Sequence, residues 1–187
     1  ETGYTGDKVC TVCKQTIEKG TEVKALGHNY VKGVCTRCDA KQPGYNPFTD
    51  VKKGPYYDAI LWAYCNGVTN GISDTVFGVD NGCTRAQIVT FLYRAAGSPE
   101  LAKDAANPFS DVSDSSVYYN AILWAVEKKI TTGVTETTFV PNDTCTRAQA
   151  VTFLYRAAGS PEVKADTVNP FTDVSKDSVY YNAILWA

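Results

Sequence analysis

Methionine is absent from the 187-residue chain, and histidine occurs once, at His28. Because residue 1 is not a methionine, we expect the chain to be a fragment of a longer protein. No apolar run approaches the roughly 20 residues of a membrane-spanning helix, and no signal peptide or sorting tail is present. The sequence therefore gives no indication of membrane insertion.

Neither sign of charge predominates, because 18 basic and 20 acidic residues leave a net charge of −2. This balance argues against a nucleic-acid-binding surface or an anionic-membrane anchor. The single histidine lies in the Cys-rich segment, and the sequence contains no recognisable motif that pairs a serine or cysteine nucleophile with a base. The recurrent aspartates occur once per repeat, as a structural role requires. We therefore expect that the protein is not an enzyme.

The chain is instead rich in repetition. Asn-Pro-Phe-Thr/Ser-Asp-Val begins at Asn46, Asn107 and Asn169, at spacings of 61 and 62 residues, and Tyr-Tyr-x-Ala-Ile-Leu-Trp-Ala follows each time. The first two copies continue to an identical block, Val-Thr-Phe-Leu-Tyr-Arg-Ala-Ala-Gly-Ser-Pro-Glu, whereas the third stops at Ala187. Such an array buries its apolar surface by stacking one unit on the next. The predicted units are a Cys-rich module over 1–43, repeats over 44–104 and 105–166, and a truncated repeat over 167–187.

Each repeat has the pattern of two helices joined by a long loop. Apolar spacing predicts a first helix over Tyr56 to Asn66, and the loop of about 15 residues after it is anchored by Phe77, or by Phe139 in the second copy. Thr84 and Thr146 each start a capping box that opens a second helix, with Gln87 and Gln149 reaching back. Val89, Leu92, Tyr93 and Ala96 form its expected core stripe. The predicted fold is mainly α, with pseudo-symmetric helix–loop–helix repeats.

Arginine in the first turn of the second helix is unexpected, because a cation there faces the positive end of the helix dipole. Arg85 and Arg147, together with the free amides of the first turn, form a predicted anion site for a ligand carboxylate or phosphate. The alternative is a structural ion pair with an aspartate of the Phe-x-Asp-Val motif: Asp50, Asp111 or Asp173.

The tryptophans leave a similar choice open. Trp62, Trp124 and Trp186 lie in the first helices, where an aromatic residue usually belongs to the core. A glycan-binding groove would instead use such rings as stacking platforms.

The N-terminal segment carries two Cys-x-x-Cys pairs, which are Cys10 with Cys13 and Cys35 with Cys38. Their separation suits a structural zinc site, and the polar segment between them is too poor in apolar residues to fold by burial alone. Two disulfides are the alternative, because an exported protein can meet an oxidising medium. Two roles are open for His28, which are zinc binding and a structural role in a turn.

This segment resembles Cys-rich repeats of large surface proteins of gut Firmicutes. The matching motifs are Gly-Tyr-Thr-Gly-Asp-Lys-x-Cys-x-x-Cys from Gly3 to Cys13, Gly-His-x-Tyr from Gly27 to Tyr30, and Gly-Val-Cys-Thr-x-Cys from Gly33 to Cys38. The resemblance implies a small ribbon-like module.

From Asn46 to Ala187 the pattern resembles the S-layer homology family. The first copy shows Phe48-Thr49-Asp50-Val51, the tryptophan-containing helix, Val68-Thr69-Asn70-Gly71 and Thr84-Arg85-Ala86-Gln87. The second copy repeats these elements in register, with Ile130-Thr131-Thr132-Gly133 as its turn.

The resemblance implies a pseudo-threefold helical domain whose grooves bind secondary cell-wall polysaccharide, often through a pyruvyl ketal carboxylate. It therefore implies non-covalent anchoring in the cell wall or S-layer of a Gram-positive bacterium. The Thr-Arg-Ala arginine is a ligand contact in the family. The predicted glycan-binding residues are Arg85, Arg147, Asp50, Asp111, Trp62, Trp124, Thr84 and Thr146.

Departures from the family pattern lead to further expectations. The third copy lacks its second helix, so at most two arginine-bearing grooves can form, and the open face favours self-association. Cys65 and Cys83 flank the first loop and are a predicted local disulfide. Glu127 replaces the first of these in the second copy, so Cys145 is an expected buried free thiol. The alternative function is a surface adhesin or protein-interaction module.

Overall fold

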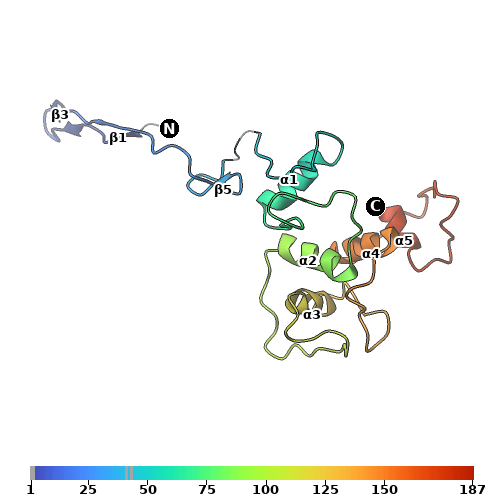
Figure 1. Cartoon of the computed structure of the whole chain (residues 1–187). Coiled ribbons are helices and arrows are strands. Elements are labelled where there is room, and N and C mark those ends of the chain that lie inside the picture. The colour runs from blue at the N-terminus through green and yellow to red at the C-terminus, as the bar shows by residue number, and fades with distance from the viewer. Residues whose placement is uncertain (1–2, 41, 43) are drawn as a thin grey trace. The chain divides into compact units, whose positions relative to one another are not determined.

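The computed structural model describes residues 3–40, 42 and 44–187, in two compact units, Glu1–Asn46 and Pro47–Ala187 (Figure 1). The predicted module boundary at residue 43 lies outside the described residues. No helix among the described residues has the length and apolar character that a membrane span needs.

The described residues of the first unit form three two-stranded antiparallel sheets whose strands are two or three residues long. Its pairs are β1 (Gly3–Tyr4) with β4 (Glu22–Val23), β2 (Lys8–Val9) with β3 (Thr16–Glu18), and β5 (Tyr30–Val31) with β6 (Val34–Cys35). Most of these residues are exposed, as expected for a segment with few apolar side chains. Cys35 is an exception, with none of its surface exposed.

The regular structure of the second unit is helical. Its helices are α1 (Tyr57–Cys65), α2 (Arg85–Ala95), α3 (Tyr119–Glu127), α4 (Arg147–Ala157) and α5 (Tyr181–Trp186). The predicted first and second helices of each complete repeat are confirmed. Helices make up 25% of the chain, because long irregular loops separate them. The expectation of a mainly α fold is therefore met only in part.

Both predicted capping boxes are present. Thr84 Oγ1 accepts the amide of Gln87 at 3.2 Å, and Gln87 Oε1 accepts the amide of Thr84 at 2.8 Å. Thr146 and Gln149 repeat this exchange at 3.2 and 3.1 Å. Each threonine thus stops the loop and starts the helix at a fixed residue.

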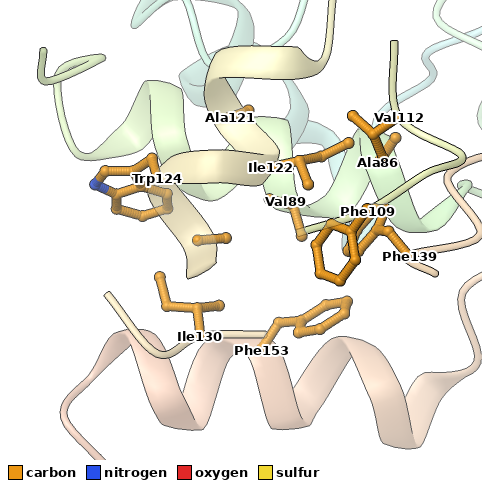
Figure 2. Close-up of a cluster of buried hydrophobic side chains, with 11 residues drawn as sticks. Ala86, Val89, Phe109, Val112, Ala121, Ile122, Trp124, Ile130, Phe139 and Phe153 are labelled. Carbon is orange, nitrogen blue, oxygen red and sulfur yellow. The ribbon is translucent and has the colours of Figure 1, made fainter. Parts of the chain in front are cut away.

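The core of the second unit lies between the two complete repeats. Among the described helices, α2 packs against α3 and α4, and α4 packs against α5. Figure 2 shows the buried cluster, in which side chains of α2 and α3 meet Phe109, Phe139 and Phe153. On α2, Val89 is buried as predicted, but Ala96 is exposed because it caps the C-terminal end of the helix.

A carboxylate closes the long loop of each complete repeat. Asp50 accepts the backbone amides of Phe77, Gly78 and Val79 at 2.8, 2.7 and 3.2 Å. Asp111 accepts those of Phe139 and Val140 at 2.9 and 2.7 Å. The motif at the start of a repeat therefore holds the end of its own loop. This places Phe139 in the core, where it is fully buried.

Candidate functional site

Two grooves run beside the second helices of the complete repeats. Groove 1 encloses about 390 Å³, and groove 2 about 250 Å³. Their linings correspond position by position: Thr69, Gln87, Thr90, Arg94 and Tyr118 in groove 1 are matched by Thr131, Gln149, Thr152, Arg156 and Tyr180 in groove 2. Each groove thus combines the turn and second helix of one repeat with the start of the next repeat's first helix.

Arg85 distinguishes groove 2 from groove 1. It belongs to repeat 1 by sequence, yet it lines the groove of repeat 2. Its Nε donates to the carbonyl of Phe139 at 2.9 Å, and its guanidinium lies 4.8 Å from the ring centroid of Phe139 and 5.4 Å from that of Phe153. The residue is only 4% exposed, and this burial lowers the pKa of its guanidinium.

No carboxylate neutralises Arg85 at ion-pair distance within the described residues, where the ion pairs join Lys8 to Glu18 and Lys128 to Glu127. The nearby Asp111 uses both carboxylate oxygens on loop amides. A buried cation without a paired anion is energetically costly, so an anionic partner from outside would stabilise it.

The expectation of free amides at the start of α2 is wrong. The amides of Arg85 and Ala86 donate to the carbonyls of Asp143 and Pro141 at 2.9 and 3.1 Å. The third amide, that of Gln87, donates to the capping hydroxyl of Thr84. The loop of repeat 2 and the cap therefore satisfy these donors, and the Arg85 side chain is the remaining positive group.

Sequence reasoning did not identify the second arginine of groove 2. Arg156 Nη1 donates to the carbonyl of Ile130 at 3.3 Å, and Arg94 Nη1 donates to that of Val68 at 3.4 Å in groove 1. Both arginines lie in the identical block of the two repeats, which was the available signal. Groove 2 thus has two arginines from different repeats.

The other predicted glycan-binding residues lie in different surroundings. Arg147 and Thr146 are exposed at the start of α4. Trp124 is 6% exposed and packs on Tyr93, with 5.6 Å between ring centroids, whereas Trp62 is 51% exposed. Neither tryptophan lines groove 1 or groove 2.

A possible metal site lies in the first unit. His28, Cys35 and Cys38 place their ligand atoms within 4.8 Å of one another. Cys38 Sγ lies 3.4 Å from His28 Nδ1, and the His28 ring stacks on Tyr30. Among the described residues, the other Cys-x-x-Cys pair is not part of this group. The structure thus gathers one histidine and two cysteines in place of the predicted four-cysteine arrangement.

The two Cys-x-x-Cys loops share the same local fold. The Lys14 amide donates to the Cys10 carbonyl and the Asp39 amide donates to the Cys35 carbonyl, both at 3.0 Å. At the second loop, Cys35 Sγ also accepts the amide of Arg37 at 3.5 Å. Chiefly because of that amide, the pKa of Cys35 is lowered to about 6. What differs is the histidine, which hairpin β5–β6 brings beside the second loop and which has no counterpart at the first.

Paired helices, carboxylate-closed loops and grooves shared between neighbouring units define the second unit as a helical repeat domain. Residues 47–89 and 108–151 match the S-layer homology domain. The chain therefore contains two S-layer homology motifs.

Curated relatives are consistent with this assignment. The chain is 39% identical over 117 residues to a cell surface protein of Thermoanaerobacter kivui, covering 60% of this chain and 15% of that protein. It is 34% identical over 115 residues to the middle cell wall protein of Brevibacillus brevis, covering 60% and 11%. An endoglucanase of Bacillus sp. is 37% identical over 112 residues, covering 59% and 12%. The chain thus spans 15% or less of the length of these relatives.

Proposed function

We propose that the chain anchors its parent protein non-covalently to the outside of a Gram-positive cell by binding secondary cell-wall polysaccharide in groove 2. The S-layer homology motifs, together with relatives that are surface and cell-wall proteins, support a cell-wall location and an anchoring role. S-layer homology domains bind cell-wall polysaccharide in general, and the chain's own groove suggests which part of the glycan is held.

The buried, unpaired guanidinium of Arg85 is the observation that carries the proposal. A pyruvyl ketal supplies a carboxylate of fixed position, and a guanidinium binds a carboxylate through two parallel hydrogen bonds. Arg156 adds positive charge, while Gln149 offers a side-chain amide that can hydrogen-bond to sugar hydroxyls. Binding then needs no chemical step, and we propose a non-enzymatic role.

The remaining predicted residues take different proposed roles. Asp50 and Asp111 shape the loops, and Thr84 and Thr146 position the arginines that follow them. Arg147 is placed on α4 as Arg85 is on α2, and we propose that it binds glycan from its exposed position there. The tryptophans would support the helices that line the grooves.

The test is sedimentation of the chain with purified Gram-positive wall sacculi, before and after mild acid removes ketal pyruvate. We expect binding to native sacculi only. The Arg85→Gln variant, which keeps a side chain that can hydrogen-bond to the Phe139 carbonyl, should bind at least about tenfold more weakly, as expected for loss of a charge-assisted pair. Arg94→Gln in groove 1 is the matched control and should bind like the wild type.

The adhesin alternative predicts a different pattern, in which binding to a protein partner survives both pyruvate removal and Arg85→Gln. Circular dichroism on each variant separates loss of folding from loss of binding. Equal sedimentation with both kinds of sacculi would contradict the role of the carboxylate while leaving wall binding intact.

We also propose that His28, Cys35 and Cys38 hold a structural zinc ion in the first unit. Thiolate and imidazole are preferred zinc ligands, and the three ligand atoms already lie close together. A fourth ligand would complete a tetrahedral site.

Cobalt(II) reports on such a site through its thiolate absorption bands. We expect the bands on titration of the wild-type chain, and their loss in Cys38→Ser. The paired change of Cys10→Ser and Cys13→Ser is the matched control. Unchanged bands in Cys38→Ser with loss in the control would assign the metal to the first loop instead.

A further inference from the structure

The loops that precede α2 and α4 meet in an antiparallel bridge. Thr84 of repeat 1 pairs with Thr144 of repeat 2. The flanking hydrogen bonds run from the Cys145 amide to the Cys83 carbonyl and from the Arg85 amide to the Asp143 carbonyl, both at 2.9 Å. These bonds fix the register, which therefore sets Cys83 directly opposite Cys145.

Opposed residues of this kind suit a covalent link. In an antiparallel pair at a hydrogen-bonded position, Cα atoms are about 5.5 Å apart and the side chains project to the same face. Disulfides most often join Cα atoms about 5.5–6 Å apart. The register of the bridge therefore predicts a Cα separation for Cys83 and Cys145 within the range that disulfides join.

The surroundings of the two sulfurs favour a retained bond. Both cysteines are thiols in the structure and are partly buried. Cys145 packs against the buried cluster, and its Sγ donates to the carbonyl of Thr146 at 3.7 Å. Burial raises the pKa of both thiols, so the pair reacts slowly with reductants that enter from solvent.

We propose that Cys83 and Cys145 form a disulfide that links repeat 1 to repeat 2 beside Arg85. The oxidant is a small-molecule disulfide, as found in oxidising extracellular media. One protein thiolate attacks it and releases one small thiol, and the second protein thiolate then displaces the other. The two thiol hydrogens leave on the released thiols, so two protein thiols are oxidised as one disulfide is reduced.

This inference differs from both cysteine predictions made on sequence. It gives Cys145 a partner, and it takes Cys83 away from the predicted bond with Cys65, which no contact in the structure tests. The link would close a loop that contains α2 of repeat 1 together with α3 and the long loop of repeat 2. It would also hold fixed the junction at which Arg85 enters groove 2.

Tryptic mapping separates the alternatives because of where lysine and arginine fall. Residues 54–85 form one peptide containing Cys65 and Cys83, and residues 130–147 form another containing Cys145. The chain is incubated with oxidised glutathione, its remaining thiols are alkylated, and it is digested without reduction. We expect the two peptides to be joined, and to separate on reduction. The joined product should persist in Cys65→Ser and vanish in Cys83→Ser.

A bond within peptide 54–85, with Cys145 alkylated, would overturn the proposal in favour of the local disulfide. Alkylation of both Cys83 and Cys145 would also overturn it. As a second measurement, reduction should lower the Tm of the oxidised chain by about 10 °C, as expected when a loop of this length is opened. The double variant Cys83→Ser with Cys145→Ser should show no such shift.

Discussion

Helices α1 and α3 contain the same Ala-Ile-Leu-Trp-Ala sequence, yet they lie in different environments. In α3 the residues Ala121 to Ala125 are all buried, whereas none of the residues of α1 is buried. The difference arises because α2 packs on α3, while α1 has no comparably packed helix among the described residues. Whether this helix is buried therefore depends on how it packs against the neighbouring repeat. The helix sequence alone does not determine it.

The largest expected effect tests this comparison at the tryptophans. Trp124→Ala should lower the free energy of unfolding by about 3–5 kcal/mol, because it removes a core side chain and leaves a cavity. Trp62→Ala, at the exposed counterpart, should cost about 0.5 kcal/mol. Urea unfolding followed by circular dichroism measures both. Equal losses would mean that α1 is as well packed as α3.

A smaller effect is expected where the loop closes. Asp111→Ala removes the acceptor for the amides of Phe139 and Val140, and should destabilise repeat 2 by about 1–3 kcal/mol. Asp114→Ala, a nearby surface carboxylate outside the loop closure, is the control and should stay within about 0.5 kcal/mol. Urea midpoints compare the two, and a loss in the control alone would contradict this role for Asp111.

The helix caps should respond alike in both repeats. Thr84→Ala and Thr146→Ala each remove a side-chain acceptor, at an expected cost of about 1 kcal/mol. Thr→Ser at the same positions keeps the hydroxyl and should cost much less. Thermal unfolding measures the four variants. A cost confined to one repeat would show that the second repeat starts its helix by other means.

The smallest effect concerns pH. Three loop amides, that of Phe77 first, lower the pKa of Asp50 in the folded chain. Its stabilising contribution is therefore present above the ordinary aspartate pKa near 4 and is lost as pH falls through the lower folded value. We expect the Tm of Asp50→Asn to fall less than that of the wild type between pH 5 and pH 2. Parallel curves would contradict this.

The sequence predicted the features that depend on residues close together in the chain. The helices, the capping boxes and the anchoring role of Phe139 follow from spacing and from short-range hydrogen bonds. The sequence did not predict that Arg85 lines groove 2. That position depends on the carbonyls of Pro141 and Asp143, which belong to another repeat and accept the first amides of α2. The grouping of His28 with one cysteine pair likewise depends on a hairpin whose register a polar sequence specifies weakly.

The position of Arg85 means that the boundaries of groove 2 do not coincide with the boundaries of the sequence repeats. Because groove 2 takes its buried cation from one repeat and its walls from the next two, the proposed binding unit is offset from the repeated sequence by about half a period. Copying a repeat therefore copies no complete groove; it creates new boundaries at which the cation of one copy must suit the walls of another.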